Sequence, residues 1–229
     1  MRVLFVVLLV AALGASAPMP NKVDTGSKTV GERMVLKPDS AWNELPGGEP
    51  AHVWTMEGVP IDQLIIYSGI KDGEAINPVA SSSKDKRFRF RSTMQADEIV
   101  SLFEGLLTRN GSTFELTKLE PASFGGGKGF RFEYTLMRKA DNVPLSGLGF
   151  ATVNSGELFA VVYNAPRLAF FPRYEAKVEH LAQSVRISPA PPAAIAAASG
   201  TNQPAADPER GRGPRCATPM ECNARGLTK

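Results

Sequence analysis

The sequence predicts an α+β fold in which an antiparallel β-sheet is sandwiched by helices. In two segments the apolar residues recur at helical spacing, and between those segments they alternate with polar residues at a period of two. Residues 33–188 are long enough to form one domain with a substantial core. We therefore expect a single folded domain over residues 33–188.

Two helices are expected, on either side of a run of strands. The first carries an apolar stripe at i, i+3, i+4, i+7 and i+8, made of Ile99, Leu102, Phe103, Leu106 and Leu107. Asp97 and Glu98 suit its first turn, and Asn110-Gly111 marks its end. The second runs from about residue 172 to 183 and would bury Tyr174, Val178 and Leu181.

The strands are expected where the period changes to two. Upstream of the first helix these are residues 52–56 and 64–67. Between the helices they lie around residues 114–116, 130–136, 144–153 and 159–163, with hairpin turns at Asp141-Asn142 and at residues 154–156. A short strand at residues 185–187 closes the domain.

This order of elements resembles the Mog1/PsbP-like fold over residues 94–187. Residues 129–135 (GFRFEYT) are similar to that family's long central strand, and residues 155–159 and 184–187 also look similar. Upstream, residues 41–46 (AWNELP) and 53–58 (VWTMEG) resemble a group of exported bacterial envelope proteins of undefined role, often lipoproteins. The chain lacks the Cys that anchors a lipoprotein. The resemblance implies a binding or assembly role without catalysis.

The N-terminus predicts export. Arg2 precedes an apolar run from Val3 to Leu13, and residues 15–17 give the small-x-small pattern of a signal peptidase site. We therefore expect a signal peptide at residues 1–17 and a location in the periplasm or cell envelope. Because Pro18 is unfavourable just after a cleavage site, cleavage after Gly14 and an uncleaved anchor remain alternatives.

Flexible segments are expected on both sides of the domain, a leader at residues 18–32 and a tail at 189–229. More than half of the tail is Pro, Ala or Gly and none of it is aromatic, so it cannot bury enough apolar surface to fold. Cys216 and Cys222 lie in this tail, where an exported protein could form a disulfide. The chain has 26 basic and 23 acidic side chains, and the tail accounts for most of the net charge of +3. The domain is therefore not expected to bind nucleic acid.

No pattern in the sequence indicates catalysis, a metal or a cofactor. The two histidines, His52 and His180, are far apart, and there is no Cys/His cluster. The glycine-rich run at residues 125–129 lacks the Ser or Thr and the helix that follow in a P-loop, so it is interpreted as a hairpin. Ser146 is not part of a nucleophile elbow. Asp97 and Glu98 are adjacent and would point apart on a helix, so they are interpreted as capping residues.

A basic segment at residues 84–91 is the strongest candidate site. On a strand, Arg87, Arg89 and Arg91 would share one face and Phe88 and Phe90 the other. Either the arginines protect an edge strand, or they bind an anionic partner such as a lipid headgroup, a cell-wall polymer or an acidic protein. We expect a non-catalytic, exported envelope binding or assembly module, for which association with a membrane surface is one expected mode. The alternative is an envelope hydrolase whose site forms only by tertiary contacts.

Overall fold

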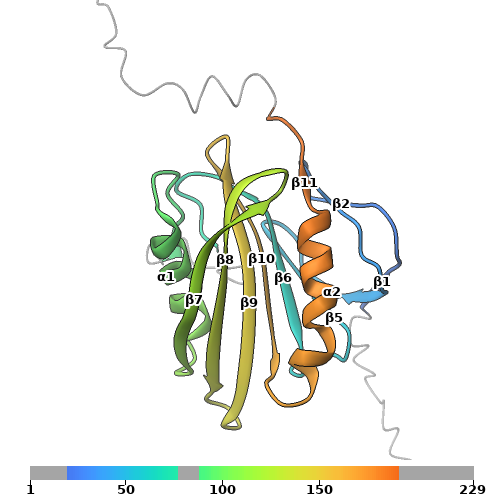
Figure 1. Cartoon of the computed structure of the whole chain (residues 1–229), viewed down its shortest axis with the longest axis vertical. Coiled ribbons are helices and arrows are strands. Elements are labelled where there is room, and N and C mark those ends of the chain that lie inside the picture. The colour runs from blue at the N-terminus through green and yellow to red at the C-terminus, as the bar shows by residue number, and fades with distance from the viewer. Residues whose placement is uncertain (1–19, 77–87, 191–229) are drawn as a thin grey trace, which may run out of the picture. The chain divides into compact units, whose positions relative to one another are not determined.

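The computed structural model of the chain describes residues 20–76 and 88–190, which belong to one compact unit. Its main element is an antiparallel sheet of eight strands (Figure 1). In spatial order the strands are β1 (Asn21–Val23), β4 (Trp42–Glu44), β5 (Ala51–Thr55), β6 (Gln63–Ile70), β10 (Glu157–Pro166), β9 (Val143–Asn154), β8 (Gly127–Arg138) and β7 (Thr113–Phe124).

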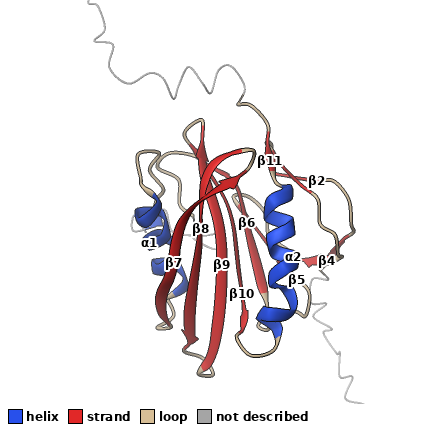
Figure 2. Cartoon of the chain, in the orientation of Figure 1, coloured by secondary structure: helices blue, strands red, loops and turns tan. Residues whose placement is uncertain are grey.

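A second, smaller sheet and two helices complete the described fold (Figure 2). The small sheet has the order β11 (Arg186–Ile187), β3 (Met34–Leu36) and β2 (Lys28–Val30). The helices are α1 (Ala96–Leu107) and α2 (Phe170–Ser184). The prediction of a single α+β domain built on an antiparallel sheet is therefore confirmed.

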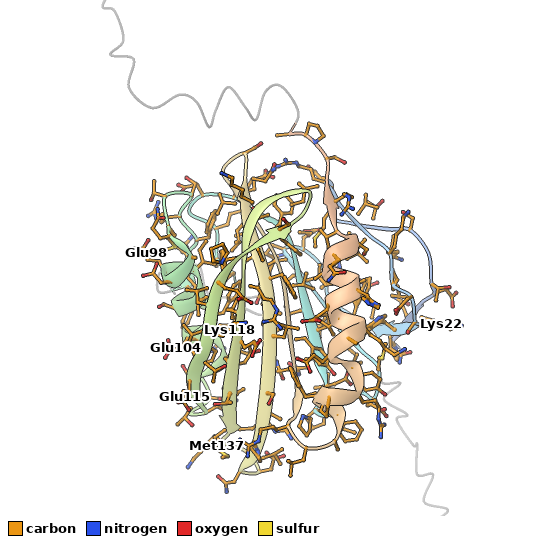
Figure 3. All side chains as sticks on the ribbon, in the orientation of Figure 1. Lys22, Glu98, Glu104, Glu115, Lys118 and Met137 are labelled. Atoms are coloured by element: carbon orange, nitrogen blue, oxygen red, sulfur yellow. The ribbon has the colours of Figure 1, made fainter. Side chains whose placement is uncertain are left out.

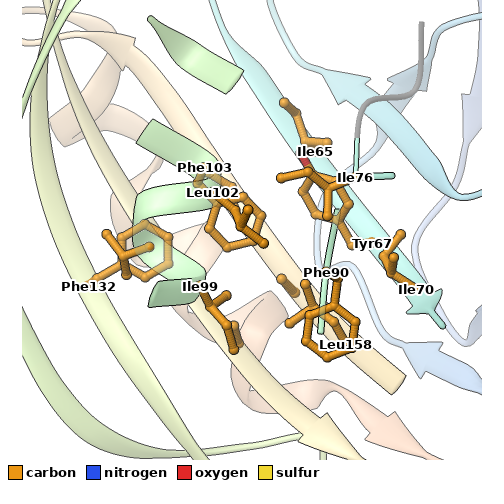
Figure 4. Close-up of a cluster of buried hydrophobic side chains, with 14 of the residues drawn as sticks. Ile65, Tyr67, Ile70, Ile76, Phe90, Ile99, Leu102, Phe103, Phe132 and Leu158 are labelled. Atoms are coloured by element: carbon orange, nitrogen blue, oxygen red, sulfur yellow. The ribbon is translucent and has the colours of Figure 1, made fainter. Parts of the chain in front are cut away.

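Each face of the large sheet has its own hydrophobic cluster, because alternate residues of a strand point to opposite faces. In β10, Leu158 and Ala160 pack with the apolar stripe of α1, whereas Phe159 and Val161 pack with α2. Beside α1, Ile76, Phe88 and Phe90 cover the same face, and Figure 4 shows Phe90 next to Tyr67 and Leu158. Beside α2, the small sheet covers the other face. Each face is thus covered by one helix together with non-helical segments.

Two glycines in β9 make room for the aromatic side chains of β8. A Cβ atom on Gly147 would lie 2.0 Å from the Tyr134 ring, and one on Gly149 would lie 2.2 Å from the Phe132 ring. Both distances are far below van der Waals contact, so these rings lie directly over the β9 backbone. The residue pattern FRFEY in β8 therefore requires glycine at both facing positions of β9.

Three turns and the start of α1 form where the sequence predicts them. Gly125 and Gly126 form the turn between β7 and β8, which confirms the hairpin interpretation of the glycine-rich run. Asn142 and Ser155 adopt positive φ angles in the two predicted turns. At the start of α1 the Gln95 backbone N–H donates to Glu98 Oε2 over 2.8 Å, as expected for a capping residue.

The leader expected at residues 18–32 is wrong over its described part. Residues 21–23 and 28–30 form β1 and β2, and each strand buries one valine, Val23 or Val30, in the cluster beneath α2. Strands of three residues with a single buried position are too short to show a period of two. The predicted signal peptide, most of the tail and both cysteines lie outside the described residues.

Candidate functional site

A cavity of about 580 Å³ lies at the end of strand β6, and charged residues that are far apart in the sequence line it. Its size falls within the usual range of small-ligand sites. Pro50, Ser68, Gly69 and Ala75 form part of its wall. The rest of the wall is charged and consists of Glu32, Arg33, Glu49, Lys71, Glu74, Arg89 and Glu157.

A β-bulge in β6 creates one side of this cavity. In the pairing with β10, Ser68 faces Phe159 and Ile70 faces Leu158, so Gly69 is an extra residue without a partner in the register. Gly69 has a φ of 119°, which favours glycine, and a Cβ atom there would lie 3.3 Å from the Phe159 ring. Bulges redirect neighbouring side chains and often occur beside functional sites. Here the bulge places Ser68 and Gly69 on the cavity wall.

Arg33 is part of the cavity wall and is almost fully buried. Its guanidinium donates to Ser188 O over 3.0 Å, to Asn154 Oδ1 over 2.6 Å and to the Glu157 carboxylate. It also lies over the Phe159 ring, 5.1 Å from the centroid. Since these partners occupy the guanidinium, Arg33 joins the small sheet to the β9–β10 hairpin and has little capacity left for a ligand.

A chain of polar contacts runs from Ser68 on β6 to Glu44 on β4. The Ser68 hydroxyl donates to Glu49 Oε2 over 2.9 Å, and the other oxygen of Glu49 lies 3.3 Å from His52 Nε2. His52 Nδ1 lies 2.9 Å from Glu44 Oε1. The imidazole therefore contacts the carboxylate and not the hydroxyl, so it cannot take a proton directly from Ser68.

The rest of the cavity wall presents both signs of charge. The Lys71 backbone N–H donates to Glu74 Oε2 over 2.9 Å, which holds the Glu74 side chain against the backbone of Lys71. Within the described residues, the Lys71 ammonium makes no ion pair. Arg89 donates to Gly73 O over 2.6 Å and faces the same cavity. After the Arg33–Glu157 pair is set aside, two cations and three carboxylates remain on the wall.

The predicted arginine strip is divided by the structure. Arg89 lines the cavity, Arg91 lies 3.6 Å from Asp72, and Arg87 is outside the described residues. Phe88 and Phe90 are both buried, which confirms that they share an inward face. Residue 89 pairs with Ala75 in an isolated bridge outside the large sheet, so the interpretation as a guard of that sheet's edge is wrong.

The other candidate residues have structural partners. His180 is exposed and lies 3.6 Å from Asp39, while His52 is held by two glutamates. Ser146 lies within β9, opposite Thr135 of β8. The buried Asp62 accepts hydrogen bonds from Thr55 Oγ1 and from the backbone of Met56 and Glu57, which fixes the β5–β6 loop.

Among residues 20–76 and 88–190, no group of three or more potential ligands could hold a metal ion. Neither described helix is long and apolar enough to cross a membrane.

A second cavity, of about 320 Å³, lies between the start of α1 and strands β7 and β8. It is mainly apolar, with Met94, Ile99, Leu119 and Phe130 in its wall.

Five residues of the cavity wall were not predicted as site residues: Arg33, Glu49, Ser68, Lys71 and Glu74. Their positions in the sequence show no motif, because four of them lie on turns, bulges or loops outside periodic segments. An Arg two residues after a Gly in a turn, as with Gly31 and Arg33, was the available signal, and this pattern is too common to be specific.

Comparison with solved structures gives distant likenesses. No family model and no curated protein matches the sequence. Cyanobacterial PsbP (CyanoP) from Synechocystis sp. PCC 6803 is 15% identical, with a TM-score of 0.48, over 78% of this chain and 98% of that one. LpqN of Mycobacterium tuberculosis, involved in cell envelope biogenesis, is 14% identical, with a TM-score of 0.40, over 74% and 91%.

A third solved structure, PA94 of Pseudomonas aeruginosa, has unknown function and is 16% identical, with a TM-score of 0.38, over 74% of this chain and 99% of that one. The resemblance found in the sequence, to PsbP-like and envelope proteins, agrees with these likenesses. At such TM-scores and identities no site or activity is carried over from them.

Proposed function

We propose that this chain is an exported, non-catalytic binding module, and that the charged cavity at the end of β6 holds its ligand. The ligand would be a small zwitterion, with a carboxylate for Lys71 and Arg89 and an ammonium group for Glu74 and Glu49. Export is supported by the apolar run at residues 3–13 followed by the small-x-small pattern.

The observation that carries the proposal is the arrangement of Lys71 and Glu74. They lie on one wall of the cavity and are held together by the bond from the Lys71 N–H to Glu74 Oε2. Groups of opposite charge on one wall complement a ligand that carries both charges. Hydrogen bonds to charged groups are among the stronger ones in proteins, so two such contacts give useful affinity to a small molecule.

The contacts of Ser68 favour binding over catalysis. A Cβ atom on Gly31 would lie 2.6 Å from Ser68 Oγ, so the hydroxyl is closely confined between the Gly31 backbone and Glu49. Ser68 is 7% exposed. A nucleophile needs access to its substrate and a base oriented by a third group. Because Ser68 is confined, its hydroxyl lacks the access to a substrate that a nucleophile needs.

Isothermal titration calorimetry with L-alanyl-L-alanine tests the proposal. The dipeptide should bind, whereas acetate and ethylamine, which carry one charge each, should bind much more weakly. Lys71→Gln and Glu74→Gln should each lower the affinity by about tenfold or more, since each removes one charged contact. Lys28→Gln and Glu104→Gln make the same changes at exposed positions away from the cavity and should leave binding unchanged.

The proposed zwitterion site is wrong if the dipeptide, acetate and ethylamine bind with the same affinity. It is also wrong if Lys71→Gln and Glu74→Gln bind the dipeptide as the wild type does.

The alternative function is an envelope hydrolase, and the hydrogen bond from Ser68 to Glu49 is the observation that favours it. In that case Glu49 would act as the general base for the Ser68 hydroxyl. A nitrophenyl ester assay separates the two functions. Ester hydrolysis that is lost in Ser68→Ala supports the hydrolase, whereas hydrolysis that is absent from wild type, or unchanged in Ser68→Ala, supports a binding module.

A further inference from the structure

Three loops meet at the end of the sheet that carries the β8–β9 turn (Figure 1). The Arg138 guanidinium donates to Pro60 O in the β5–β6 loop. The Arg167 backbone N–H, just after β10, donates to Pro144 O over 3.0 Å, and Pro144 faces Met137 in the β8–β9 register. These contacts bring loops from distant parts of the sequence to one end of the molecule.

This end is unusually apolar for an exposed surface. Val59 is 44% exposed, Met137 is 43% exposed and Leu168 is 86% exposed. They account for three of the four large apolar side chains that are exposed in the described part of the chain. Figure 3 shows Met137 near the end of the sheet that carries the β8–β9 turn. We call Val59, Met137 and Leu168 the apolar tip.

Basic side chains surround the apolar tip. Arg138 pairs with Asp141, and Arg173 pairs with Glu57. Arg109, Lys139 and Arg167 are exposed, and among the residues that the structure describes they make no ion pair. The Lys139 backbone N–H donates to Ser112 Oγ over 3.1 Å, which places the loop that carries Arg109 beside the β8–β9 turn. Glu115, near the start of β7, is an exposed carboxylate that makes no ion pair with another described residue.

Exposed apolar side chains within a basic rim are the features by which peripheral proteins bind anionic membranes. The apolar groups enter the boundary between headgroups and acyl chains, and the cations are attracted to acidic lipids. We propose that the apolar tip and its rim of Arg109, Lys139 and Arg167 dock on an anionic phospholipid surface. This surface is separate from the charged cavity, so it does not depend on the proposed ligand.

The charges on the tip favour a lipid surface over a second protein. Arg109, Lys139 and Arg167 make no ion pair with any other described residue, and cations of this kind on three neighbouring loops match a planar, uniformly anionic surface. The core of a protein interface is instead depleted in charged residues. Long Arg and Lys side chains can also reach headgroups while the tip residues enter the apolar layer.

Flotation of the full chain with vesicles tests the inference. One set contains only phosphatidylcholine, and the other contains phosphatidylcholine with phosphatidylglycerol. Wild type should prefer the anionic vesicles, and high salt should remove the preference because it screens exposed charges. The triple variant Arg109→Gln, Lys139→Gln, Arg167→Gln should bind anionic vesicles about 100-fold more weakly. Each basic group near an anionic membrane raises the binding affinity about fivefold, and the variant removes three of them.

A matched triple variant, Lys28→Gln, Lys37→Gln, Lys128→Gln, removes the same charge from exposed positions elsewhere and should keep the preference. Leu168→Gln should weaken binding with no change in charge. If wild type shows no preference for anionic vesicles, or if the two triple variants lose it equally, the inference is wrong. Should the tip variant fail to fold, the salt dependence of wild type and the Leu168→Gln variant decide the question.

Discussion

Removal of Arg33 tests whether this residue holds the two sheets together. Its side chain is 6% exposed and that of its ion-pair partner Glu157 is 14% exposed. Breaking a buried ion pair from one side costs about 3–5 kcal/mol, because the remaining charge stays buried without a partner. Glu157 keeps some contact with solvent, so Arg33→Met should lower the free energy of unfolding by about 3 kcal/mol.

Urea denaturation measures this change. With a slope of about 1–3 kcal/mol per molar urea, the midpoint should fall by roughly 1–3 M. The double variant Arg33→Met, Glu157→Met should recover most of the loss, since replacing both charges by apolar groups is often neutral. Arg109→Met, at an exposed arginine, should change stability by less than about 0.5 kcal/mol. A loss below about 1 kcal/mol in Arg33→Met, or no recovery in the double variant, would show that the buried Arg33–Glu157 pair does not hold the two sheets together.

Three further outcomes are expected. Gly147→Ala should destabilise the domain by about 1–3 kcal/mol in the same assay, because the new methyl group meets the Tyr134 ring; an unchanged midpoint would contradict this. Burial and the neighbouring carboxylates Glu179 and Glu133 raise the pKa of Glu175 above the usual glutamate value of 4.5. The domain should therefore lose stability as the pH rises above 4.5 and Glu175 ionises. Glu175→Gln should therefore raise the melting temperature at pH 7 and not near pH 4, and an equal effect at both would oppose the assignment. A reporter that is active only after export, fused to residues 1–40, should be active, and a cytoplasmic reporter would argue against the signal at residues 3–13.

Long periodic segments explain what the sequence could predict. The stripe from Ile99 to Leu107 and the alternation in residues 130–136 each repeat several times, and both elements are found within a few residues of their predicted bounds. The hairpin turns at Asn142 and Ser155 were predicted by turn chemistry alone. Short elements were missed, since Val23 and Val30 are single buried positions in strands of three residues.

The site was not predictable because its residues are neighbours only in space. Arg33 and Glu157 are separated by 124 positions in the sequence, and Ser68 and Glu49 by 19. The bulge at Gly69 was also hidden, since Gly in a strand marks a bulge only once the pairing partner is known. Arg89 was singled out for its charge, and the structure places it in the cavity without making it part of a continuous arginine face.

The most direct test of the account is an NMR titration of the full chain with L-alanyl-L-alanine. If the cavity at the end of β6 is the binding site, the backbone amide signals of Ser68, Gly69, Lys71 and Glu74 should shift saturably, while that of Leu168 at the apolar tip stays in place. In Lys71→Gln the dipeptide should bind more weakly, and the amide signals that shift should still be those of the cavity. Absence of shifts at these four amides, or saturable shifts confined to another surface, would contradict the proposed binding function.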